Sequence, residues 1–149
     1  MSYIDRNLLA DERVIFRTRK HLIIFLTPVI LSILALYPFF SDNFFLREIA
    51  RLIWIVALIL WGHTFLIYYT SEFAVTNKRV MMKEGFFYRH ANEMRLATIA
   101  RVDIDQSLLG QLFNYGNIAI NSFGTSVDNF SQIASPNAFQ KAVQEAQQT

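Results

Sequence analysis

Side chains that could do chemistry are few and widely spaced in this chain of 149 residues. It contains no cysteine, which excludes disulfides, thiolate metal ligands and thiol catalysis. The histidines are His21, His63 and His90, and no two of them have the close spacing typical of metal ligands. The sequence also has no catalytic-triad, phosphate-loop or other nucleophile motif. We therefore expect no metal and no cofactor, and a protein that is not an enzyme.

Two carboxylates do lie close together. Asp103 and Asp105 are two residues apart in an alternating segment, so a strand would place both on one face. They could form an acid pair or bind calcium. A calcium site would need a third carboxylate nearby or a glycine-bearing loop, and the sequence around them has neither. We interpret the pair as the solvent face of a strand.

Basic residues gather at two places that could contact lipid phosphates. Arg17, Arg19 and Lys20 precede an apolar segment, whereas Lys78 and Arg79 belong to a turn and the strand after it. Each cation near an anionic membrane contributes roughly 1 kcal/mol to binding. The alternative is that these cations only set the orientation in the membrane or lie near it. The formal charge is only +2 and there is no long Lys/Arg run, so a nucleic-acid partner is not expected.

Two apolar segments organise the first half of the chain. Residues 22–40 and 53–69 contain no Asp, Glu, Lys or Arg. At about 1.5 Å of rise per residue, each can cross most or all of a roughly 30 Å hydrocarbon layer as a helix. The sequence therefore predicts a transmembrane hairpin over residues 22–69 with a short connector, 41–52. The alternative, two core helices of a soluble protein, is disfavoured because too few residues remain to cover them.

The distribution of basic residues predicts the orientation of this hairpin. Residues 1–21 form an amphipathic and basic segment, and most other basic residues follow residue 69. The positive-inside rule then places both termini in the cytoplasm and the connector outside. His63 would lie inside the second helix, where an ionisable side chain suggests a function. The alternative is a neutral histidine that is hydrogen-bonded to a facing helix.

Residues 70–149 have the pattern of one small β-rich domain. Short apolar stretches alternate with turn residues, which predicts about six or seven antiparallel strands. Ser135 is a good helix N-cap and Pro136 suits a first helical position, so a C-terminal helix is expected at about 136–148. The expected fold class is α+β, with a two-helix transmembrane hairpin followed by a small antiparallel barrel or sheet that this helix caps.

Three stretches carry a resemblance to a known family. They are residues 73–80 (FAVTNKRV), residues 99–118 (IARVDIDQSLLGQLFNYGNI) and residues 130–139 (FSQIASPNAF). Together with the order of elements, they resemble the bacterial pleckstrin-homology-like (PH-like) domain and, more closely, the small YdbS-like membrane proteins that carry it. The resemblance covers nearly the whole chain. It implies a strongly bent barrel in a protein of the bacterial inner (cytoplasmic) membrane, and no particular activity.

The remaining candidate is a contact surface in the loop 106–115. Its large side chains are Leu108, Leu109, Leu112, Phe113 and Tyr115. They would either contact a partner or plug the core of the barrel. We expect a membrane-anchored module for protein–protein interaction or self-assembly, with membrane lipids and a second copy or another membrane protein as partners. The alternatives are lipid-headgroup or peptide binding, and an accessory subunit of a transport or membrane enzyme complex.

Overall fold

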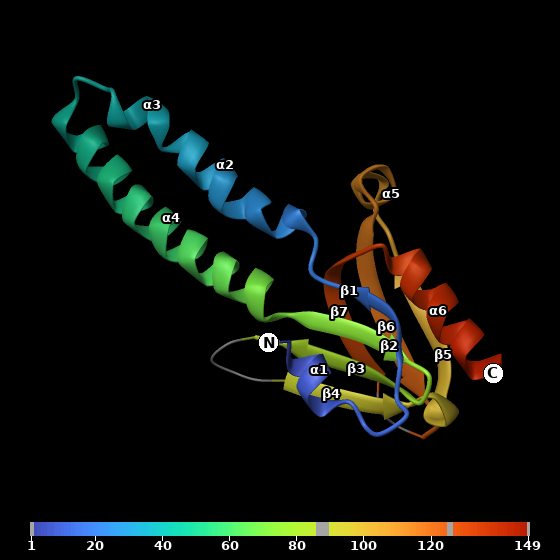
Figure 1. Ribbon diagram of the computed structural model, residues 1–149. Coiled ribbons are helices and arrows are strands. Elements are labelled where there is room, and N and C mark those ends of the chain that lie inside the picture. The colour runs from blue at the N-terminus through green and yellow to red at the C-terminus, as the bar shows by residue number, and fades with distance from the viewer. Residues whose placement is uncertain (1, 86–89, 125–126, 149) are drawn as a thin grey trace.

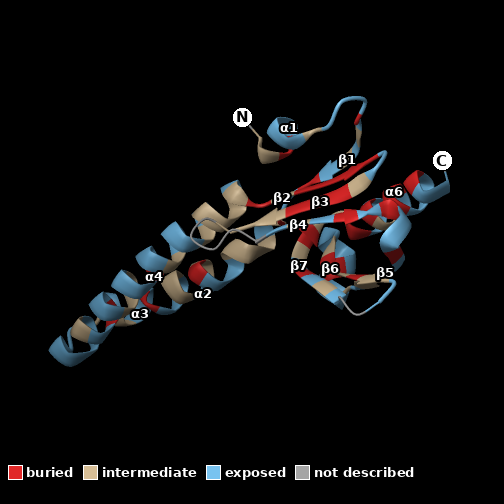
Figure 2. Cartoon of the chain, turned by 90° about the horizontal axis from the view of Figure 1, so that it is seen from below, coloured by how far each residue is buried: buried red, intermediate tan, exposed pale blue. Residues whose placement is uncertain are grey.

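The computed structural model describes residues 2–85, 90–124 and 127–148, with only the backbone of His90. A long helical hairpin projects from one end of a β-rich domain, and a C-terminal helix lies along that domain (Figure 1). Most hairpin residues are exposed, whereas buried residues gather in the domain (Figure 2). Short connections around His21 and Ser71 join the two parts.

The hairpin has two antiparallel arms. The first contains the short helix η1 (Leu22–Phe25), α2 (Leu26–Leu34) and α3 (Leu36–Phe39), and the second is the helix α4 (Phe44–Thr70). Within the described residues, both arms are long and apolar enough to cross a membrane, with mean hydropathy of 2.4 and 1.8. Only 11% of each apolar stretch is buried. Since a core helix of a soluble protein would be mostly buried, the hairpin does not belong to a core of the domain.

Helix α4 begins well before residue 53, so the connector is 40–43 rather than 41–52. Asn43 caps the helix: its side-chain oxygen accepts hydrogen bonds from the backbone N–H groups of Phe45 and Leu46, over 2.9 and 3.4 Å. One turn later, Glu48 and Arg51 form an exposed ion pair at 2.6 Å. Glu48 and Arg51 lie just before the apolar run that starts at residue 53, which is why the sequence predicted a later start for this helix. The helix accommodates both residues on its exposed face.

Four strands form the first antiparallel sheet, in the order β1-β2-β3-β4. They are β1 (Val14–Thr18), β2 (Glu72–Thr76), β3 (Arg79–Glu84) and β4 (His90–Arg95). In the register, Thr18 lies opposite Phe73, and Val80 lies opposite Met94. The sheet therefore takes its first strand from the N-terminal segment. The domain begins before the hairpin, in contrast to the sequence-based division into 1–21 and 70–149, and the hairpin is inserted between β1 and β2.

Three further strands form the second antiparallel sheet, in the order β5-β6-β7. They are β5 (Ile99–Asp105), β6 (Tyr115–Ser122) and β7 (Val127–Ala134); the short helix η2 (Leu96–Thr98) precedes β5, and α5 (Leu108–Phe113) separates β5 from β6. The two sheets meet where the chain after β1 reaches β7. There the Ala134 N–H donates to the Arg19 carbonyl over 3.0 Å, and the His21 N–H donates to the Gln132 carbonyl over 2.8 Å.

Helix α6 (Pro136–Gln148) packs against both sheets, as the spacing of its apolar residues predicts. The core combines side chains from all three layers: Phe73, Val75, Val80 and Met82 from the first sheet, Val102, Ile118, Ile120 and Phe130 from the second, and Phe139, Ala142, Val143 and Ala146 from α6. The other face of the first sheet is covered by α1 (Tyr3–Asn7), whose Ile4 packs on Ala74 and Met81.

Candidate functional site

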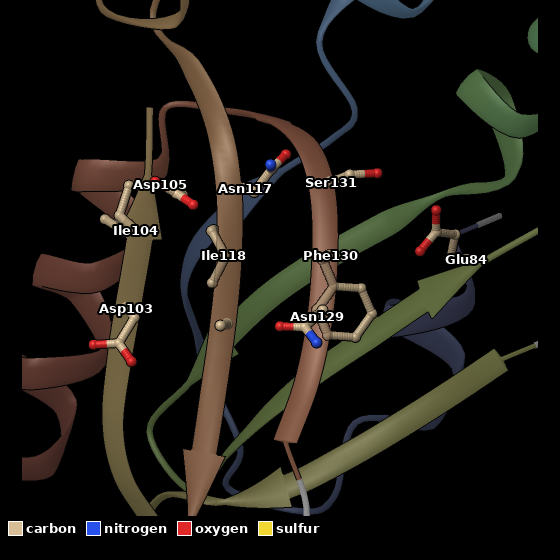
Figure 3. Close-up of a pocket in the computed structure, with 10 residues that line it drawn as sticks. Glu84, Asp103, Ile104, Asp105, Asn117, Ile118, Asn129, Phe130 and Ser131 are labelled. Carbon is tan, nitrogen blue, oxygen red and sulfur yellow. The ribbon is translucent and has the colours of Figure 1, made fainter. Parts of the chain in front are cut away.

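A cavity of about 740 Å³ lies along the second sheet, with Glu84 of β3 at one side (Figure 3). Strands β5, β6 and β7 all contribute to its lining, which is rich in side-chain oxygens and amides: Asp103, Asp105, Asn117, Asn129 and Ser131. These residues come from the exposed face of the alternating strands. The cavity thus offers mainly hydrogen-bond acceptors, three of them carboxylates.

Two of the three carboxylates at this cavity already have basic partners. Asp103 accepts one hydrogen bond over 2.9 Å from the Asn121 side chain and contacts the Arg101 guanidinium at the same distance. Glu84 pairs with Lys20 at 2.5 Å. Among the described residues, no group of three or more His, Asp or Glu side chains could hold a metal ion. The arrangement is suited to binding a polar or basic group.

Lys20 is a buried structural cation, although its position in the sequence made it a candidate for lipid contact. Its side chain is only 4% exposed. The ammonium donates to the Ser131 carbonyl over 2.9 Å and pairs with Glu84. It thereby connects β3 to β7 across the corner where the two sheets meet, so its charge is neutralised inside the domain.

Arg79 is also engaged within the domain, in a cluster around Glu12. The Glu12 side chain is 0% exposed and that of Arg79 is 15% exposed. Arg79 Nε donates to Glu12 Oε1 over 2.9 Å, and Nη2 donates to Oε2 over 3.1 Å. The Thr76 hydroxyl and the Leu9 N–H donate to the same carboxylate over 2.7 and 2.8 Å. Arg79 also donates to Glu93, so this cluster ties the N-terminal segment to β3 and β4.

The Glu12 cluster holds both partners in their charged forms. Burial by itself would raise the pKa of Glu12, but hydrogen bonds, that from Arg79 foremost, and the charge of Arg79 lower this pKa below its ordinary value of 4.5. The hydrogen bond to Glu12 raises the pKa of Arg79. Thr76 and Arg79, the two defined residues of the Thr-x-x-Arg pattern, thus both donate hydrogen bonds to Glu12 within the domain.

The other candidate lipid contacts lie at different ends of the domain. Lys78 sits in the β2–β3 turn, at the end of β2 away from α4 (Figure 1), where its ammonium donates to the Ala10 carbonyl over 3.2 Å. Arg17 pairs with Asp5 at 2.6 Å, and its hydrogen bond lowers the pKa of that carboxyl. Arg19 is exposed. The five candidate cations therefore do not form one patch.

The loop 106–115 does not plug the core. It forms the exposed helix α5, in which Leu108 is 86% and Leu112 is 75% exposed, with Leu109 and Phe113 about half exposed. The Ser107 hydroxyl accepts a hydrogen bond from the Gly110 N–H over 3.1 Å, and Asn114 ends the helix in the left-handed conformation. The candidate contact surface is thus a preformed apolar tip.

His63 lies at an exposed position of α4. Its side chain is exposed, and within the described part of the chain it has no hydrogen bond. The polar contact between the arms is instead made by Trp61, whose Nε1 donates to Ser32 over 3.2 Å. The hydrogen bond from His63 to the facing arm is not seen within the described residues, and the role of His63 stays a prediction.

Two ionic contacts that stabilise the domain were missed in the sequence: the Glu12 cluster and the pair of Lys20 and Glu84. Each joins residues more than sixty positions apart. A weak signal existed for the first, because Thr76 and Arg79 both lie in residues 73–80, one of the stretches that carry the family resemblance. No local pattern pointed to the second.

A comparison with protein-family models identifies the family of this chain. A family model described as "Bacterial PH domain" matches residues 5–147, a range that begins before β1 and contains the hairpin. Among solved structures, a DUF1696 family protein with a pleckstrin-homology domain from Shewanella loihica PV-4 has a TM-score of 0.49 at 8% sequence identity, covering 97% of this chain and 89% of that chain. No curated protein matches the chain.

Proposed function

Because the chain belongs to the bacterial PH domain family, we propose that it is a non-enzymatic binding module, anchored by its helical hairpin in the bacterial inner (cytoplasmic) membrane. Both termini and the β-domain lie in the cytoplasm, and residues 40–43 lie on the periplasmic side. The exposed apolar helices and the concentration of basic residues outside the hairpin support this placement.

The observation that carries this proposal is the shortness of both connections between hairpin and domain. His21 alone separates η1 from Lys20, which is bridged to Ile133 in β7. Ser71 alone separates α4 from β2, and its N–H continues the helix by donating to the Ile67 carbonyl over 3.0 Å. With one residue between the bridged Lys20 and η1, and one between α4 and β2, the domain cannot turn freely. It presents one fixed surface to the cytoplasm.

A polypeptide partner suits this surface better than an anionic lipid headgroup. The cavity on the second sheet contains Asp105, a carboxylate that forms no ion pair within the described residues and repels phosphate. Lys20 and Arg79, which would have attracted a headgroup, are already paired with carboxylates. We assign the cavity to a basic or amide-rich segment of a second copy or of another membrane protein.

One observation favours the accessory-subunit version of this proposal. His63 is exposed on α4 and has no partner within the described residues. A polar side chain inside a membrane helix is unfavourable unless another polar group binds it. A neighbouring membrane protein or second copy would supply that group.

The mass of the full-length protein in nanodiscs, with co-purified species identified, tests this function. We expect a defined homo-oligomer or a stoichiometric complex with a second protein. Asp105→Lys should weaken the complex if the cavity binds the partner, and His63→Leu should weaken it if α4 does; Gln144→Lys, on the exposed face of α6, is the matched control. A monomer that carries only lipid would contradict the proposal and favour headgroup binding.

A further inference from the structure

Helix α5 leaves an unusual amount of apolar surface uncovered. Leu108, Leu109, Leu112 and Phe113 are 86%, 52%, 75% and 53% exposed, and all four belong to one six-residue helix. Such a group of neighbouring side chains is unfavourable in water and marks a contact with an apolar partner.

The position of α5 points to the surface from which the hairpin emerges. Phe113 lines an apolar cavity of about 290 Å³ together with six residues at the start of the first arm: His21, Leu22, Ile23, Phe25, Leu26 and Val29. Just after α5, the Tyr115 ring stacks on the His21 ring with centroids 5.1 Å apart. In Figure 1, α5 lies on the side of the domain that faces the hairpin. The exposed side chains of α5 therefore continue the apolar surface of Leu22 and Leu26, which are 62% and 45% exposed.

The composition of α5 also suits a layer of low polarity. Residues 106–115 contain no Asp, Glu, Lys or Arg. Some backbone groups at both ends of the helix are bonded within the loop: the Ser107 hydroxyl accepts from the Gly110 N–H over 3.1 Å, and the Asn114 N–H donates to the Gly110 carbonyl. Each bonded backbone group lowers the cost of moving this tip out of water.

We infer that α5 inserts its leucine side chains and Phe113 into the boundary between headgroups and acyl chains of the cytoplasmic leaflet. This inference rests on the proposed anchoring of the hairpin. The domain is then attached to the bilayer at three points, the two arms of the hairpin and α5. Interfacial apolar helices reach about 5–10 Å into the membrane. The bilayer is favoured over a protein partner because it already covers the adjoining surface of Leu22 and Leu26.

Spin labels at single cysteines test this inference, because the natural chain has no cysteine. The label is placed at Leu112→Cys in the full-length protein, reconstituted in vesicles of phosphatidylethanolamine and phosphatidylglycerol. Ile33→Cys, on the exposed side of α2, is the lipid reference, and Gln144→Cys on α6 is the aqueous reference. Collision with oxygen reports lipid, and collision with a water-soluble nickel chelate reports solvent.

The label at position 112 is expected to be more accessible to oxygen than to nickel, as at position 33, and position 144 should show the opposite order. If position 33 reports lipid while position 112 reports water, the inference is overturned and the anchor stands. Low accessibility to both reagents at position 112 would mean a protein contact, which also overturns it. If position 33 itself reports water, the proposed anchoring fails. Leu108→Cys repeats the test at a second exposed site.

Discussion

Replacing Arg79 by methionine is expected to lower the free energy of unfolding of the β-domain by about 3–5 kcal/mol. The substitution leaves the fully buried Glu12 carboxylate without its bidentate partner, and burying an unpaired charge is strongly unfavourable. It also removes the tie between the N-terminal segment and β3. Urea denaturation of the full-length protein in nanodiscs, followed by the circular dichroism of the sheets, measures the change.

Arg101→Met is the matched control for this substitution. Arg101 pairs with Asp103 at 2.9 Å, but its side chain is 72% exposed. Exposed ion pairs contribute only about 0–1 kcal/mol, because water and salt screen them. If Arg79→Met cost no more than Arg101→Met, the Glu12 cluster would not be a structural tie, and Arg79 would again be available as a lipid contact.

The ion pair of Glu12 and Arg79 also makes the stability of the domain depend on pH. Glu12 has a lower pKa in the folded protein than its ordinary value of 4.5, so the unfolded state binds its proton first as the pH falls. Its stabilising contribution is therefore complete above about pH 4.5 and is lost as the pH falls through the lower folded pKa. We expect Glu12→Gln to lose less stability than the natural protein across this acid range.

Replacing Phe139 by alanine is expected to cost about 3–5 kcal/mol of stability. Phe139 is 1% exposed, and its ring meets Phe16 of β1 edge to face, with centroids 6.4 Å apart. Because α6 packs on both sheets, the cavity left by the ring would lie where they meet and could not collapse easily. Phe123→Ala, at a ring that is 73% exposed, is the control and should change stability by about 0.5 kcal/mol or less. Equal effects would contradict the assigned core.

Local patterns in the sequence predicted the helices and strands of this fold more reliably than the pairing between them. Ser135 and Pro136 predicted where α6 begins, and the uncharged apolar runs predicted the two arms of the hairpin. These signals depend on neighbouring residues. The pairing of β1 with β2 has no such signal, because the whole hairpin separates the two strands.

The candidate site was harder to predict for the same reason. A basic residue before an apolar run, such as Lys20, has the same sequence signature whether it contacts lipid or a buried carboxylate. Only the fold brings Glu84 to its ammonium. The apolar residues of α5 were likewise consistent with a core plug or an exposed tip, because a six-residue helix is too short for periodicity to identify a buried face. Their exposure resolves that alternative.

In the proposed topology, the hairpin spans the membrane and the domain lies on the cytoplasmic side. Cysteine labelling in intact spheroplasts with a membrane-impermeant maleimide tests it most directly. The account predicts that Asp42→Cys, in the connector between the arms, is labelled in intact spheroplasts, whereas Gln144→Cys on α6 is labelled only after lysis. Labelling of Gln144→Cys in intact spheroplasts, or protection of Asp42→Cys until lysis, would contradict this topology.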